Sequence, residues 1–256
     1  MMDKCENKSR AEELTSFLMK LDKSKNASGL RKQANRLISN VTPDDIQKAE
    51  KKLVKIGLPI KKIQQLSASF VLMGILEGNS STLRPRLPDN HVLRKVMAEH
   101  EMMRCFIADL EDVASGIQQK DKLTPASSEF MRLSHIVEHL NSLEEHMDRE
   151  NDVLFPALRE LGWKSLFDHI ESEHTYILMS VRDLVKLVMA FDKMPFKNFK
   201  TRLMATVRYL GPLLREHLFR EDQAIFPLAI SMVQDEAVWK KLQTICNEID
   251  YCGIHL

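Results

Sequence analysis

Apolar positions recur every three or four residues along most of the chain, which is the period of an amphipathic helix. In the N-terminal third, this pattern predicts short helices. One of them begins after Thr42, because Thr is a good N-cap, Pro43 suits the first helical position, and Asp44 and Asp45 place acids in the first turn. Another is expected over about 59–76.

Four longer helical patterns follow a segment rich in Gly, Ser and Pro at 78–89. They cover about 89–115, 124–162, 165–191 and 198–232, and a shorter pattern at 235–251 is consistent with a terminal helix. Connections this short favour antiparallel neighbours, so we expect an all-α protein built on an up-down four-helix bundle. We place a small helical domain at 1–80 and the bundle domain at 81–256.

The composition supports helices and excludes several functions. Only 8 Gly and 9 Pro are present, too few for a loop-rich β protein. A formal net charge of +1 gives no reason to expect binding to nucleic acid or to an acidic membrane surface. No stretch reaches the ~18 apolar residues of a membrane span, and the N-terminus lacks the apolar segment of a signal peptide, so we expect a cytoplasmic protein.

The cysteines contain no CxxC pair of the kind that marks a zinc or redox site. They are Cys5, Cys105, Cys246 and Cys252. We interpret all of them as reduced thiols.

Two segments of the chain repeat one motif. Residues 145–156 and 216–227 both follow the pattern EHxxRExxx[LI]FP without a gap. This agreement indicates that the second and fourth long helices are counterparts in an internally duplicated bundle. A fainter echo links Glu99-His100 on the first helix with Glu173-His174 on the third.

The spacing inside the repeat brings a histidine and a carboxylate together. Residues four apart on a helix differ by only about 40° around its axis, so His146 with Glu150, and His217 with Glu221, each share one face. A single HxxxE is usually a solvated surface pair. Two copies in register in a bundle core instead indicate metal, because a buried ionised Glu requires a counter-charge.

These residues resemble the hemerythrin-like family, also called HHE cation-binding domains, over about residues 88–232. The resemblance implies a bundle of hemerythrin type with two non-haem iron ions, with or without an oxo or hydroxo bridge. The implied ligands are four histidines, one from each helix, and two bridging glutamates: His100 and His146 for one iron, His174 and His217 for the other, and Glu150 and Glu221 as bridges. This four-His, two-Glu set resembles the di-iron repair and sensing members more than the oxygen carriers, which have five histidines and an Asp after the last one.

Several other side chains are candidates for secondary roles near such a centre. The histidines that could be extra ligands, or core or rim histidines, are His91, His135, His139 and His169. Acceptors for the imidazole N–H groups are expected among Glu99, Glu145, Glu173 and Glu216. Pro156 and Pro227 each remove a helical hydrogen bond just past the site, so we expect a kink or an irregular turn there.

The N-terminal segment carries a second resemblance, on residues 41–46, 57–60 and 63–66. It is similar to a small helical domain of unknown function that is often fused ahead of hemerythrin-like domains in prokaryotes. Members commonly have a Cys and a His after this stretch, where this chain has Ser67 and Phe70. We therefore expect a docking module, through a protein partner or a homodimer, rather than a metal or redox site.

Three functions remain open from the sequence. In the first, a binding module, the di-iron centre reversibly binds or senses oxygen, nitric oxide or iron. The second is a di-iron redox enzyme, for example one that repairs iron-sulfur clusters or reduces peroxide or nitric oxide. The third gives the metal a structural role only. We prefer the binding module.

Overall fold

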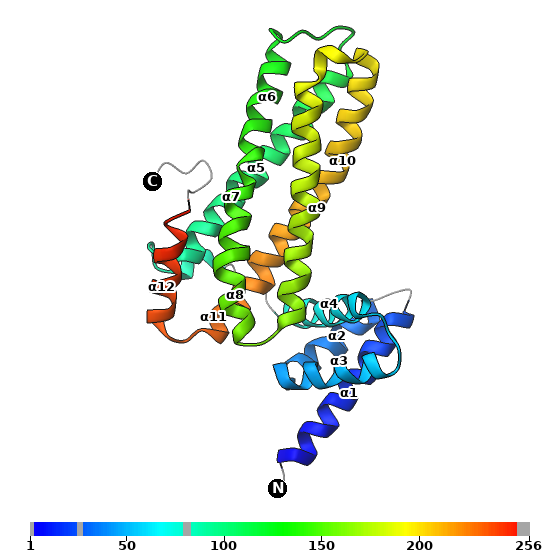
Figure 1. Cartoon of the computed structure of the whole chain (residues 1–256), viewed down its shortest axis with the longest axis vertical. Coiled ribbons are helices and arrows are strands. Elements are labelled where there is room, and N and C mark those ends of the chain that lie inside the picture. Colours follow the sequence, from blue (N-terminus) through cyan, green and yellow to red (C-terminus); the bar gives the residue numbers. More distant parts are fainter. Residues whose placement is uncertain (1–2, 25–27, 79–82, 250–256) are drawn as a thin grey trace. The chain divides into compact units, whose positions relative to one another are not determined.

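The computed structural model describes residues 3–24, 28–78 and 83–249, and all regular structure in these ranges is helical (Figure 1). The prediction of an all-α fold is therefore confirmed. Within the same ranges, no helix combines the length and the apolar character needed to cross a membrane.

The helices follow the predicted order, with the second and fourth long patterns each divided into shorter elements. The N-terminal ones are α1 (Asp3–Lys23), α2 (Ser28–Ile38), α3 (Pro43–Lys55) and α4 (Ile60–Gly78). The later ones are η1 (Arg84–Arg86), α5 (Val92–Gln118), α6 (Ser128–Asn141), α7 (Leu143–Asp148), η2 (Arg149–Leu154), α8 (Phe155–Glu160), α9 (Lys164–Met189), η3 (Phe191–Lys193), α10 (Phe196–Arg220), η4 (Glu221–Ile225), α11 (Phe226–Met232) and α12 (Glu236–Cys246). Here η1 and η3 are 3₁₀-helices, whereas η2 and η4 are π-helices.

Contacts divide the chain into two compact units. The first joins residues up to 83 with segments 155–172 and 220–234, and the second joins 84–154, 173–219 and the chain from 235 onward. These units are defined by contacts in space, whereas the predicted domains, 1–80 and 81–256, are continuous stretches of sequence. That division stays a prediction.

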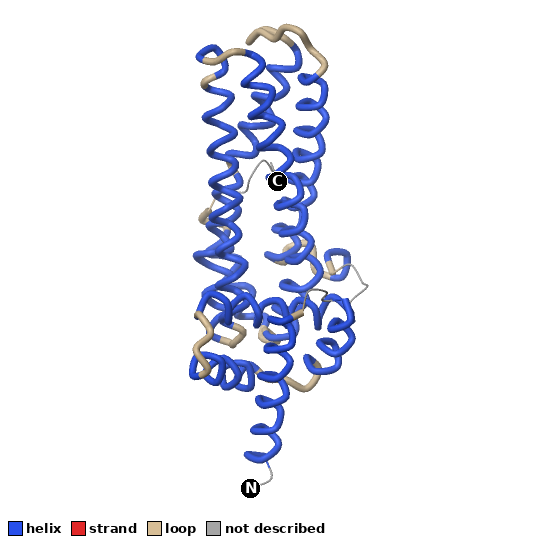
Figure 2. The backbone as a smooth tube through the Cα atoms, turned by 90° about the vertical axis from the view of Figure 1, so that its right-hand side faces the viewer, coloured by secondary structure: helices blue, strands red, loops and turns tan. Residues whose placement is uncertain are grey.

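The second unit is organised around a continuous apolar core. Figure 1 shows α5, α6, α9 and α10 as long helices running side by side, and in Figure 2 their connecting loops lie at the helix ends. Each helix supplies fully buried aliphatic side chains to one cluster, such as Ile107 and Leu110 on α5, Leu140 on α6, Leu184 on α9 and Leu210 on α10. The three- and four-residue spacing of such positions explains why this stretch of sequence forms a bundle.

In the first unit, the N-terminal helices pack in pairs, α1 with α3 and α2 with α4. Phe17 and Phe70 meet edge to face with ring centroids 5.4 Å apart, and both are fully buried. Phe70 therefore belongs to the apolar core of this unit. Helix α3 starts as predicted, with Thr42 and Asp45 forming a capping box and Pro43 in the first turn.

Each of the two repeated motifs contains a π-helical turn. The π-helix η2 carries Glu150 and ends directly before Phe155-Pro156, and η4 carries Glu221 and ends directly before Phe226-Pro227. A proline has no N–H to donate, and its ring clashes with the carbonyl four residues earlier, so the ordinary α-helical ladder cannot continue through it. The predicted irregularity is confirmed, and both glutamates lie on widened turns of the kind often found at functional sites.

The turn between α8 and α9 requires a glycine for two separate reasons. Gly162 has φ +118°, and a Cβ there would lie 2.5 Å from Cβ of Pro43. Gly57 also has a positive φ, +94°, but a Cβ there would meet nothing within 4 Å.

We expect Gly162→Ala to lower the free energy of unfolding by about 2–4 kcal/mol, through backbone strain plus the clash. Gly57→Ala is the matched control and should cost about 1 kcal/mol, from strain alone. Urea unfolding of the two variants measures the difference, and equal losses would contradict the close approach to Pro43.

Candidate metal centre

Six predicted ligands lie on the elements expected of them and are buried. The histidines are His100 on α5, His146 on α7, His174 on α9 and His217 on α10, and the glutamates are Glu150 on η2 and Glu221 on η4. None of the six is more than 1% exposed. Polar side chains buried this completely must be satisfied by one another or by a bound group.

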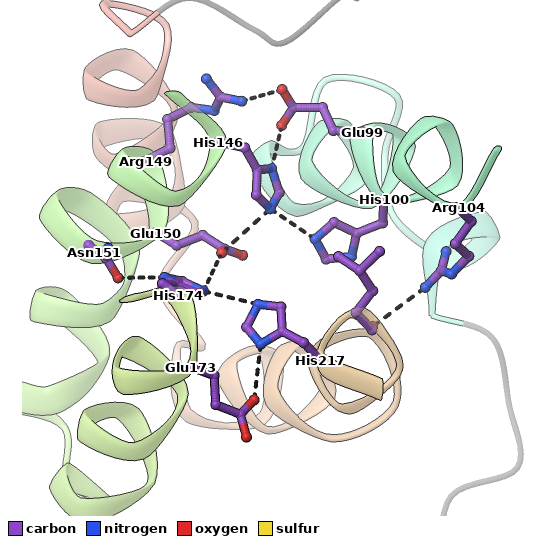
Figure 3. A network of polar contacts seen from close by, with 11 residues as sticks. Glu99, His100, Arg104, His146, Arg149, Glu150, Asn151, Glu173, His174 and His217 are labelled. Atoms are coloured by element: carbon purple, nitrogen blue, oxygen red, sulfur yellow. Dashed lines mark hydrogen bonds and ion pairs between the residues drawn. The ribbon is translucent and has the colours of Figure 1, made fainter. Parts of the chain in front are cut away.

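The ring nitrogens of the histidines meet in pairs. His100 Nε2 lies 3.1 Å from His146 Nε2, and His174 Nε2 lies 3.0 Å from His217 Nε2. Glu150 stands between the pairs, with Oε2 at 3.5 Å from His146 Nε2 and 3.4 Å from His174 Nε2 (Figure 3).

Ligand atoms gather in two groups of four that have two members in common. One group consists of His100, His146, Glu150 and Glu221, and the other of Glu150, His174, His217 and Glu221. Within each group, the ligand atoms all lie within 4.8 Å of one another. Glu150 and Glu221 thus belong to both groups.

Three of the histidines are oriented by an acceptor behind the ring (Figure 3). His146 Nδ1 lies 3.0 Å from Glu99 Oε2, His217 Nδ1 lies 3.1 Å from Glu173 Oε2, and His174 Nδ1 lies 2.8 Å from Asn151 Oδ1. Because carboxylate and amide oxygens only accept, each Nδ1 carries the hydrogen and donates it. A neutral ring then has its lone pair on Nε2, which faces the centre.

This arrangement fits a cation. The Nε2 atoms of His174 and His217 lie 3.0 Å apart, with their lone pairs facing each other. The carboxylates of Glu150 and Glu221 are buried beside them. Facing lone pairs and buried carboxylates repel one another unless positive charge lies among them. Neutral imidazole nitrogens together with carboxylate oxygens are ligands that first-row transition metals accept.

Behind His146, a buried ion pair completes the network. Arg149 is fully buried and forms an ion pair with Glu99. Burial favours the neutral acid and would raise the pKa of Glu99. The hydrogen bond from His146 and the charge of Arg149 outweigh burial, so the pKa is lowered and Glu99 stays ionised. An ionised Glu99 holds the His146 ring in place.

The comparisons with known proteins agree with this geometry. Residues 91–229, more than half of the chain, match the family described as Hemerythrin HHE cation binding domain. The chain belongs to the hemerythrin HHE family. Residues 14–68 match a family of unknown function, DUF438, ahead of the hemerythrin domain. A search of curated proteins found no significant match.

Membership of the hemerythrin family implies a metal site with His and Glu ligands, and the two buried groups are compatible with one. The resemblance stated from the repeated motifs is confirmed, as is the resemblance of the N-terminal segment.

The four other histidines in the described part of the chain lie outside both ligand groups. His91 caps α5, where its Nδ1 accepts the N–H of Leu93 at 3.2 Å, and its ring lies 4.7 Å from that of Trp239. The rings of His135 and His139 are in contact, and His139 stacks on Phe106 at 4.6 Å. His169 is likewise in neither group.

Two residues of the centre were not predicted. Arg149 holds Glu99, and Asn151 accepts from His174, whereas only Glu99 and Glu173 of the expected acceptors are confirmed. The roles suggested for Glu145 and Glu216 stay predictions. The signal for Arg149 was available, because the repeated motif contains an Arg before each Glu, and a buried Arg requires a carboxylate.

The described cysteine side chains are consistent with reduced thiols. Cys105 and Cys246 form no disulfide, whereas Cys252 and the side chain of Cys5 lie outside the described part of the chain. Burial raises the pKa of the Cys246 thiol to about 11, so this group stays a neutral thiol at physiological pH.

Proposed function

We propose that this hemerythrin-family protein holds two iron ions and uses them to bind or sense a small ligand such as oxygen or nitric oxide. The observation that carries the proposal is that two four-residue ligand groups have both Glu150 and Glu221 in common. Two metals with the glutamates as bridges account for this overlap. His100 and His146 then complete one metal site, and His174 and His217 complete the other.

The donor set favours iron with positions left open. Each group offers four ligand atoms, two from imidazoles and two from carboxylates. Sites with two histidines, carboxylate oxygen and open positions are typical of non-haem iron. Iron in this centre would supply those positions to an incoming diatomic ligand. The protein's own part is to orient the imidazoles through Glu99, Asn151 and Glu173.

A packing contact supports a sensing role. In the first unit, α4 packs against the π-helix η4, which carries Glu221. The first part of α4, residues 60–68, belongs to the segment that matches DUF438. A change in the bonds of Glu221 therefore acts on a turn that α4 contacts directly, which is what a relay of the metal's state requires.

Metal analysis of anaerobically purified protein, combined with absorption spectra before and after exposure to air or nitric oxide, tests the proposal. We expect about two irons per chain and a rapid, reversible spectral change. The variant Glu150→Ala/Glu221→Ala should lose nearly all iron, because both metals lose both carboxylates.

The matched control is Glu144→Ala, which removes an exposed glutamate of α7 that pairs with Arg182. It should keep the full iron content. Full iron in the double variant would refute the bridging roles, and one iron per chain in the unsubstituted protein would refute the dinuclear centre.

A further inference from the structure

The first unit contains a cavity that none of the metal ligands lines. Its volume is about 610 Å³, within the range of small-molecule sites. One wall comes from α3 and the start of α4, and the other from residues 159–168, which include the turn between α8 and α9. The first wall belongs to the segment that matches DUF438 and the second to the hemerythrin domain. An occupant would therefore touch both family segments at once.

The cavity offers an apolar surface that a ligand could cover. Val54, Ile60 and Leu161 line it and are 50%, 66% and 48% exposed. Large aliphatic side chains this exposed lose contact with water when a ligand with an apolar body packs on them.

The polar groups in the cavity favour a positively charged ligand. Asp168 is already paired, because Arg159 Nε lies 3.0 Å from its Oδ1 and Gln64 donates to its Oδ2 at 3.4 Å. Arg159 Nε has no hydrogen bond of good geometry, but the charge of Arg159 is balanced by ion pairs with Asp168 and Glu171. Lys51 donates to Gln47 at 3.1 Å. By contrast, Oε1 of Glu50 is buried and has no hydrogen-bond partner among the described residues. A buried carboxylate oxygen is stabilised by a hydrogen-bond donor, and most strongly by a positively charged one.

The turn that carries Trp163 is strained at the edge of this cavity. Trp163 has φ +61°, directly after Gly162 at +118°. A bulky side chain rarely adopts this left-handed conformation, and such strain concentrates at ligand sites. Trp163 lines the cavity, and an indole face attracts cations. Trp163 and Glu50 thus select the same charge.

We propose that this cavity binds a small organic cation, with its ammonium or amidinium group bonded to Glu50 and its apolar body packed against Trp163 and the aliphatic side chains. The site is independent of the metal centre, because none of the metal ligands lines it.

Fluorescence of Trp163 tests the proposal in the full-length chain. The chain has only 2 tryptophans, so Trp239→Phe leaves Trp163 as the sole indole reporter. We expect phenethylamine and benzamidine to change its emission saturably, and phenylacetate, which has the opposite charge, to have no effect.

In the Trp239→Phe chain, the further substitution Glu50→Gln should weaken binding of both cations about tenfold or more. The control Glu13→Gln, an exposed glutamate of α1 outside the cavity, should leave it unchanged.

Calorimetric titration of the unsubstituted chain with the same three compounds gives the same decision without any substitution. The proposal would be overturned if neither phenethylamine nor benzamidine bound with a Kd below about 1 mM. Equal binding of phenylacetate, or an unchanged affinity in Glu50→Gln, would also overturn it. Because iron content is measured separately, failure here leaves the proposed metal function standing.

Discussion

Replacing Arg149 by methionine is expected to lower the stability of the metal-free protein by about 3–5 kcal/mol, because it leaves Glu99 charged and buried without its cation. Arg149 and Glu99 are both fully buried, and the pKa of Glu99 is lowered, so its charge persists at neutral pH. Urea unfolding of the protein in the presence of a metal chelator measures the loss of stability.

The double variant Glu99→Gln/Arg149→Met decides whether the buried pair is the cause. Glutamine keeps an acceptor for His146, so the double variant should recover most of the stability that Arg149→Met loses. Arg182→Met is the matched control: it breaks an ion pair with Glu144 whose side chains are 53% and 50% exposed, and it should cost about 0–1 kcal/mol. A double variant as unstable as Arg149→Met would show that packing, and not charge, explains the effect.

Removing the metal is expected to have the other large effect, and it should also decide the sign of what a substitution of the two shared glutamates does to stability. A metal present at about a thousand times its Kd contributes about 4 kcal/mol to folding, so chelation should lower the thermal midpoint markedly. The metal-free protein then keeps Glu150 and Glu221 buried in one small region.

Substitution of both glutamates should therefore reverse its effect with metal content. In metal-free protein, Glu150→Gln/Glu221→Gln should raise stability by about 1–3 kcal/mol, because neutral amides cost less to bury than carboxylates. In the presence of iron, the same variant should be less stable than the unsubstituted protein. Calorimetry with and without chelator, with Glu144→Gln as control, measures both signs. A double variant less stable under both conditions would contradict a counter-charge role for the metal.

Much of the centre was predictable because its chemistry is local in the sequence. His146 with Glu150, and His217 with Glu221, are four residues apart, and helix geometry alone places each pair on one face. The repeat then identified the second and fourth long helices as counterparts, and Pro156 and Pro227 indicated irregular turns that the structure shows as η2 and η4.

The partners of these ligands were harder to predict because they come from other helices. The sequence indicated Glu99 and Glu173 only as two of four candidates, and it did not indicate that Asn151 accepts from His174. Such contacts depend on the rotation of one helix against another, which adjacent residues do not specify.

The sequence alone specifies the helices, the N-cap at Thr42 and the two His-Glu pairs, because periodicity, capping and four-residue spacing act within one turn or one helix. Only the folded chain pairs His100 with His146 and buries Arg149 against Glu99. The fold likewise brings α3 against the Gly162-Trp163 turn, and both line the cavity of the first unit. These features join residues far apart in the chain, so they exist only once apolar burial has set the packing of the helices.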